Sequence, residues 1–180
     1  MPEKAPWIKR RFTFDTPLSM FPNILERLRG TPARIEDLVR DISQGKAMKR
    51  IDGRWSIQEN IGHLIEVEDL WLGRLDDFAD GIAVLRPADM KNRRTDAAEY
   101  NKQELREILK AFRRIRTHFI QRLESMDEEA IGRMSHHPRL NQPMKIPDMM
   151  FFASEHDDHH IVRIAELLRE LELNHREDEV

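Results

Sequence analysis

The sequence predicts a single all-α domain folded as a four-helix bundle, and three observations support this prediction. Four segments repeat apolar residues at the three- and four-residue spacing of one helix face. The connections between them are polar and contain proline, which ends helices. The alternation of β-branched residues that marks a strand is nearly absent, so we expect no sheet. Four helices that each carry one apolar face bury those faces most simply in a bundle.

The first helical segment begins near Leu18 and is interrupted at Gly30. The apolar face of its first half consists of Phe21, Leu25 and Leu28. We expect Thr31 to cap a second half that has Pro32 at its first position, because a threonine oxygen accepts from a free amide and proline lacks an amide hydrogen there. The apolar face of this second half consists of Ile35, Leu38, Val39 and Ile42.

The second helical segment starts at Trp55 and runs to about Phe78. Ser56 and Glu59 have the spacing of a capping box, in which each side chain accepts from the other residue's backbone amide. A wide apolar arc follows, made of Ile57, Ile61, Leu64, Val67, Leu70, Trp71 and Leu75. This arc is therefore expected to be buried in the bundle.

The third segment covers roughly residues 101–126, and the fourth covers residues 147–173. The apolar stripe of the third segment is Leu105, Ile108, Phe112, Ile115, Phe119 and Leu123. A polar link of residues 80–100 precedes it. A second link, residues 136–143, contains Pro138 and Pro143, which preclude a continuous helix into the fourth segment.

Composition and charge narrow the classes of function. The chain has 180 residues, 39% hydrophobic and 35% charged, which suits one helical domain with charged outer faces. Its net charge of −3, with both signs interspersed, gives no argument for binding nucleic acid or a membrane. Cysteine is absent, which excludes disulfides, thiolate ligands and a cysteine nucleophile. Without a signal-like or membrane-spanning apolar run, we expect a cytoplasmic protein.

Two histidines on the fourth segment are the strongest indication of a site. His156 and His160 are four residues apart, so they lie one turn apart on the same helix face. That face is otherwise apolar and continues through Met149, Ala153, Ile164, Leu167 and Leu171. A buried polar group without a partner costs roughly 1–3 kcal/mol, and one metal ion is a partner that serves both rings. Core histidines that are satisfied by other groups remain an equal alternative for this pair.

A third histidine, His63, lies at the edge of the buried arc of the second segment. Taken alone, His63 is better interpreted as a core histidine bonded to a carbonyl or an acid. If the second and fourth helices face each other, however, three imidazoles converge and a metal site is favoured. His159 is a competing ligand on a more polar column of the helix. The remaining histidines are expected to be exposed: His118, His136, His137 and His175.

Several charged residues near these histidines are candidates for supporting roles. Glu59, Glu66 and Glu68 are candidates for contacts with the ligands or for acid–base chemistry, although surface charge is the simpler interpretation of most of them. Asp157 is a candidate to bond a ligating histidine, and a solvated helix-surface acid is the alternative. Arg163, one turn after His160, is a candidate to steer an anionic substrate, and a surface salt bridge is the alternative.

Taken together, these residues resemble the DinB-like superfamily of metal-binding four-helix bundles. The resemblance is carried in order by Thr31-Pro32, by Trp55-Ser56-x-x-Glu59-x-x-Gly62-His63-Leu64 and by His156-Asp157-x-x-His160. It covers residues 18–173, which leaves an N-terminal extension of residues 1–17 and a tail of residues 174–180. It implies an up-down-down-up bundle with a broken first helix, and one divalent metal, nickel or zinc, on His63, His156 and His160. Homodimers are frequent in such families.

The resemblance indicates a site more firmly than it indicates a reaction. Such families include transferases and isomerases that use low-molecular-weight thiols, so we expect metal-dependent group transfer or isomerisation on a small-molecule substrate. A metal-dependent hydrolase is the second expectation, and a metal-stabilised interaction or stress-response module is the non-enzymatic one. Members often have glutamine three residues after the last ligand, where this chain has Arg163. This departure concerns substrate contact rather than metal binding.

Overall fold

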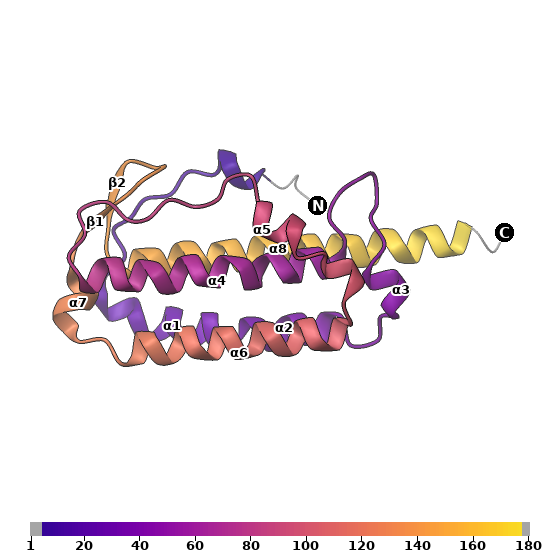
Figure 1. Ribbon diagram of the computed structural model, residues 1–180, viewed down its shortest axis with the longest axis horizontal. Coiled ribbons are helices and arrows are strands. Elements are labelled where there is room, and N and C mark those ends of the chain that lie inside the picture. Colours follow the sequence, from indigo (N-terminus) through magenta and orange to yellow (C-terminus); the bar gives the residue numbers. More distant parts are fainter. Residues whose placement is uncertain (1–4, 178–180) are drawn as a thin grey trace.

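The computed structural model describes residues 5–177 and shows an elongated helical bundle (Figure 1). The bundle helices are α1 (Phe21–Arg29), α2 (Thr31–Leu38), α4 (Ile57–Ala79), α6 (Leu105–Glu124) and α8 (Ile146–Glu177). The short helices are η1 (Trp7–Lys9), η2 (Leu18–Met20), α3 (Gln44–Ala47), α5 (Arg93–Ala97), η3 (Tyr100–Lys102) and α7 (Glu128–Gly132). The two strands are β1 (Ser135–His137) and β2 (Gln142–Met144). The expected tail and the expected exposure of His175 lie outside the described side chains.

The bundle has the expected up-down-down-up topology, with α1 and α2 together forming the broken first helix. Helices α4 and α6 run parallel, as the bonds from Arg116 to Glu68 and from Arg122 to Asp76 show. The first pair of helices and α8 run in the opposite direction (Figure 1). Because α4 and α6 are parallel, residues 80–104 must return along the whole bundle between them. This return passes over α4 and α8, beside the N-terminal segment (Figure 1).

The break in the first helix has a different cause from the one expected. Gly30 occupies the capping position, and Thr31 is already the first residue of α2 without capping it. The Thr31 hydroxyl instead donates to the buried carboxylate of Asp157, with Oγ1 and Oδ2 2.7 Å apart. The threonine therefore serves contact between helices rather than the helix end. Ser56 and Glu59 do form the expected capping box at the start of α4.

The expectation of no sheet is wrong at one place. Strands β1 and β2 pair antiparallel, with Ser135 opposite Met144, and a single parallel bridge joins Val84 to His136. Each strand has three residues, which is too short for an alternating pattern to be recognised in the sequence. The hairpin folds the second link back toward the bundle and brings its side chains to one end of α4.

A buried ionic network joins the bundle helices through Arg116 on α6. Its guanidinium donates to Glu68 on α4, to both oxygens of Asp157 on α8 at 2.5 and 3.1 Å, and to the Leu28 carbonyl on α1 at 3.1 Å. All three charged side chains are at most 2% exposed. The interpretation of Glu68 and Asp157 as surface acids is therefore wrong, because each faces an arginine that only the packed bundle brings close.

We expect Arg116→Met to destabilise the protein by about 3–5 kcal/mol, because removing the arginine leaves two buried carboxylates without their cation. The free energy of unfolding from urea denaturation measures this change. Arg114→Met is the matched control, since Arg114 is an exposed residue of the same helix and such substitutions usually stay within about 0.5 kcal/mol. Equal effects of the two substitutions would contradict the role given to the network.

Candidate metal site

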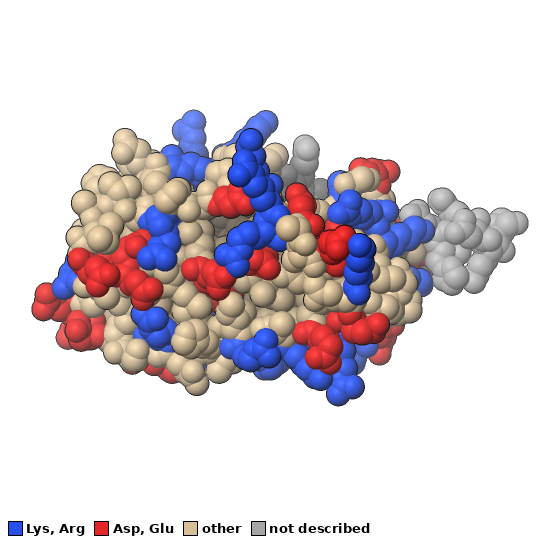
Figure 2. Space-filling view, viewed as in Figure 1, with Lys and Arg blue, Asp and Glu red and all other residues tan. Residues whose placement is uncertain are grey.

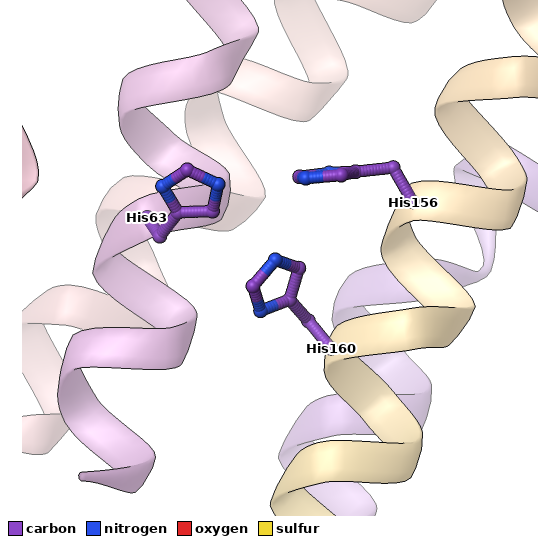
Figure 3. Close-up of side chains that lie close together, drawn as sticks. All are labelled: His63, His156 and His160. Atoms are coloured by element: carbon purple, nitrogen blue, oxygen red, sulfur yellow. The ribbon is translucent and has the colours of Figure 1, made fainter. Parts of the chain in front are cut away.

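Three histidines from two helices converge inside the bundle (Figure 3). His63 comes from α4, and His156 and His160 come from consecutive turns of α8. Each offers one ring nitrogen, and these nitrogens all lie within 4.8 Å of one another. The ring centroids are 4.7 to 5.3 Å apart. The antiparallel packing of α4 on α8 brings residues 93 positions apart in the chain into one cluster, the histidine triad.

The triad is buried, and burial keeps the imidazoles of His63 and His156 neutral. Burial lowers the pKa of His63 to about 4, with a smaller contribution from His159. Burial, with smaller contributions from His63 and His159, also lowers the pKa of His156 well below the ordinary value. Neutral imidazoles keep a lone pair on one nitrogen, which is the form that binds metals.

Side chains outside the triad orient two of its rings. Nδ1 of His160 lies 2.9 Å from Oδ1 of Asn60 on α4. The Asn60 amide nitrogen donates to the Ser56 carbonyl at 2.8 Å, so its oxygen faces the histidine. His160 therefore carries its proton on Nδ1 and has its lone pair on Nε2. Nδ1 of His63 lies 3.0 Å from the Thr95 hydroxyl, which α5 supplies. Neither Asn60 nor Thr95 could be predicted from the sequence, since neither has a spacing signal.

His156 provides a direct test of whether a metal fits. Its Nδ1 is buried and has no hydrogen-bond partner among the described residues. Aromatic rings surround the imidazole, with the centroid of Trp7 at 5.0 Å and that of Trp71 at 6.3 Å. A buried polar atom within an apolar shell is costly unless another group satisfies it. The residues present therefore fit a divalent ion between the three rings.

The triad faces a cavity of about 1200 Å³ that lies between the bundle and its covering segments. Helices α4 and α8 provide one wall. The other walls come from the N-terminal segment, from the return between α4 and α6, and from residues 137–139 after β1. Trp7 and Trp55 line the cavity close to the triad, and the ring of Trp55 lies 4.9 Å from that of His63. Trp7 belongs to the expected N-terminal extension, where no site residue is predicted from the sequence.

The other residues proposed from the sequence have separate roles. Glu59 completes the capping box and pairs with Arg50. Burial alone would raise the pKa of Glu59, but Arg50 and the Ser56 amide lower it below its usual range. Asp157 bonds Arg116 and Thr31, so these hydrogen bonds belong to the bundle network rather than to a histidine. Among the described residues, the cluster of potential ligands contains the triad and omits His159.

Two further candidates, His159 and Arg163, lie on the cavity wall beside the triad. The rings of His159 and His160 are 5.2 Å apart, and His159 also lies near Trp7. Arg163 pairs with Glu166 at 3.1 Å and with Glu170 at 3.6 Å. Its Nη2 is nevertheless buried without a hydrogen-bond partner among the described residues. The salt bridge expected for Arg163 is therefore present, and one donor of the side chain remains available.

His137 differs from the expectation of exposure, whereas His118 and His136 are exposed as expected. The alternation of β1 turns His136 outward and His137 inward, so His137 is only 3% exposed. Its Nδ1 accepts from the backbone amides of Arg139 and Leu140, at 3.3 and 3.1 Å. Burial, reinforced by Arg74 and Arg139, lowers the pKa of His137 to about 4.

The comparisons identify the family. Residues 27–162 match the DinB superfamily, and the chain belongs to it. A search of curated protein sequences gives no match. YfiT from Bacillus subtilis, described as a probable metal-dependent hydrolase with an unusual four-helix bundle topology, superposes with a TM-score of 0.77 at 16% identity. That match covers 90% of this chain and 93% of YfiT.

A second structural relative is the mycothiol-dependent maleylpyruvate isomerase, with a TM-score of 0.65 at 12% identity. The match covers 84% of this chain and 62% of the isomerase. A histidine-to-alanine variant of that isomerase gives a TM-score of 0.64 at 11% identity over the same shares of the two chains. At these identities, the similarity establishes the fold alone. No helix in residues 5–177 is long and apolar enough to cross a membrane.

Acid is expected to destabilise the metal-free protein between about pH 6.5 and pH 4. The pKa values of His63 and His137 are about 4 in the folded protein, whereas an unfolded histidine titrates near 6.5. The unfolded chain therefore binds protons first, and stability present above pH 6.5 is lost as the pH falls. The free energy of unfolding, measured by urea denaturation across this range, should fall by about 2 kcal/mol less in His137→Gln than in the unaltered protein. An unchanged pH dependence in that variant, or an equal change in exposed His136→Gln, would contradict this explanation.

Proposed function

We propose that this protein is a metal-dependent enzyme whose divalent ion, nickel or zinc, is held by His63, His156 and His160. One observation carries the proposal: three buried imidazoles converge on one point beside a large cavity. Imidazole nitrogens suit zinc, nickel, copper and iron, so the donor set supports a divalent transition metal without choosing among them. The resemblance to the superfamily favours nickel or zinc.

The cavity supports a catalytic rather than a structural metal. Structural zinc sites have four protein ligands, whereas catalytic sites have three and leave a position for water or substrate. The described residues offer three clustered ligands. A volume of about 1200 Å³ is more than one small ligand needs, so a substrate and a cosubstrate fit together. A closed module that uses metal only for stability does not need such a space.

The absence of cysteine favours a thiol cosubstrate. If the reaction needs a sulfur nucleophile, a small thiol must supply it, because the chain has no cysteine. A divalent ion with an open position lowers the pKa of a coordinated thiol or water toward neutrality. We therefore favour group transfer or isomerisation that depends on a low-molecular-weight thiol. The fold shared with a mycothiol-dependent isomerase supports this choice.

The chain's own residues then orient the reactants and exclude water. Asn60 and Thr95 hold the rings of His160 and His63, and Trp7 covers His156 from the N-terminal side. His159 lines the cavity next to the triad and is suited to exchange a proton with a bound substrate. The free donor of Arg163 is suited to contact an anionic group near the ion.

Hydrolysis is the second candidate function, and the description of YfiT as a probable metal-dependent hydrolase favours it. The same open position takes water in place of a thiol. The need for a thiol separates the two candidates: a thiol-dependent enzyme is inactive without added thiol, whereas a hydrolase is active.

We further propose that the protein is a cytoplasmic homodimer. Light scattering of the purified protein tests its oligomeric state.

Untagged protein is expected to contain about one divalent ion per chain. His160→Ala is expected to lose both the ion and the activity, because two imidazoles seldom hold such an ion alone. Elemental analysis measures the metal, and a screen of substrates with added small thiols measures activity. His118→Ala is the control, since His118 is exposed on α6. Full activity in metal-free protein or in His160→Ala would exclude the proposed mechanism.

Asn60→Ala is expected to weaken metal binding about 10- to 100-fold, because the partner that orients a ligating histidine contributes to affinity in this range. Competition with a chromophoric chelator measures the dissociation constant. Asn60→Asp keeps an oxygen acceptor for Nδ1 of His160 and should retain most of the affinity. If both variants bind metal as the unaltered protein does, Asn60 does not position the ligand.

A further inference from the structure

A buried guanidinium at the far end of the cavity has no role in the function proposed above. Arg74 on α4 is 1% exposed and lines the cavity. Its Nε and Nη2 donate to the Arg86 carbonyl at 3.2 and 3.1 Å, and the group lies over the ring of Trp71. Its Nη1 is buried and has no hydrogen-bond partner in the described part of the chain. A buried charged donor without an acceptor is expensive, so this position favours an anion.

No acid of the described residues neutralises Arg74 through an ion pair. Asp77 is the carboxylate that acts on Arg74 through its charge. Both oxygens of Asp77, however, accept hydrogen bonds from Arg86, at 2.7 to 3.1 Å. The positive charge of Arg74 is therefore left for another group.

Two residues of the hairpin also line this end of the cavity: His137 at the end of β1 and Arg139 in the turn before β2. Nδ1 of His137 accepts from backbone amides, so the neutral ring carries its hydrogen on Nε2 and is a donor there. Arg74 and Arg139 both help to lower the pKa of His137, which shows that both cations act on the ring. Arg139 is exposed and also lines the cavity.

Helix geometry places Arg74 relative to the triad. His63 and Arg74 are eleven residues apart on α4, which is three turns, so both lie on one face about 16 Å apart along the axis. Val67, Leu70 and Trp71 line the cavity between them. The cavity thus has the histidine triad at one end, an apolar middle and cationic donors at the other end.

We propose that Arg74, His137 and Arg139 form a carboxylate-binding subsite for the anionic end of an elongated substrate or cosubstrate. The reacting atom of that molecule lies at the triad; this part rests on the proposed function, whereas the subsite itself does not. A carboxylate suits the subsite better than a phosphate, because the subsite offers one buried guanidinium nitrogen of Arg74 and one N–H of the neutral His137 ring. A carboxylate has a single charge and two oxygens to match them.

The test is a titration with succinate at pH 7.5, followed by NMR of the histidine rings in metal-free protein. The ring signal of His137, assigned with His137→Gln, is expected to shift with succinate and not with the neutral analogue succinamide. Arg74→Met should weaken binding by about tenfold or more, since a charged hydrogen bond contributes about 1.5–3 kcal/mol. Circular dichroism checks that this variant folds. Arg139→Gln should weaken binding several-fold, and it removes a charge from an exposed side chain.

The controls separate this inference from the metal site. Arg114→Gln removes one exposed positive charge elsewhere and should leave succinate binding unchanged. His160→Ala should also bind succinate normally, even though it is expected to lose the metal. Absence of binding, or binding that neither Arg74→Met nor Arg139→Gln weakens, would overturn the subsite. Tighter binding of inorganic phosphate than of succinate would overturn its assignment to carboxylates.

Discussion

Arg116 is the constraint on which the arrangement of this bundle depends. A buried guanidinium is tolerated only where acceptors surround it, and here Glu68, Asp157 and the Leu28 carbonyl provide them from three other helices. Thr31 joins the same network through Asp157. Burial raises the pKa of Glu68 to about 7, although Arg116 acts in the opposite direction. The loss of water around this carboxyl group is the largest single effect on its pKa. Helices that slid or rotated by one residue would separate these charges from their partners.

The position of the histidine triad follows from this arrangement. Asp157 and His156 are neighbours on α8, so the side chain that bonds Arg116 and the one that faces α4 leave the helix on adjoining faces. Once Asp157 is held, His156 and His160 have little freedom to turn away from His63. The network also keeps a positive charge near His156, which adds to the effect of burial on its pKa. The buried charges and the histidine triad thus occupy adjoining layers of one bundle.

The parallel pairing of α4 with α6 also shapes the cavity. It requires the chain to return across the bundle, and that return supplies Thr95, Arg86 and much of the cavity wall. The N-terminal segment adds Trp7 on the same side (Figure 1). Figure 2 shows positive and negative side chains interspersed over the viewed face of the molecule. Inside the cavity, Arg74 is a buried charge, and an apolar middle separates it from the histidine triad.

The sequence by itself determined the four main helical segments, the interruption at Gly30 and the capping box at Ser56, because these features depend on local spacing and residue chemistry. It also identified the three histidines, but their convergence followed only from the resemblance to the superfamily or from helices that face each other. Only the tertiary structure decided the partners. Whether Glu68 and Asp157 are surface acids or buried ones depends on Arg116 from another helix, and Thr31 serves Asp157 rather than its own helix end. Asn60, Thr95, Trp7 and the inward turn of His137 have no periodic signal, since each acquires its role from a residue far away in the chain.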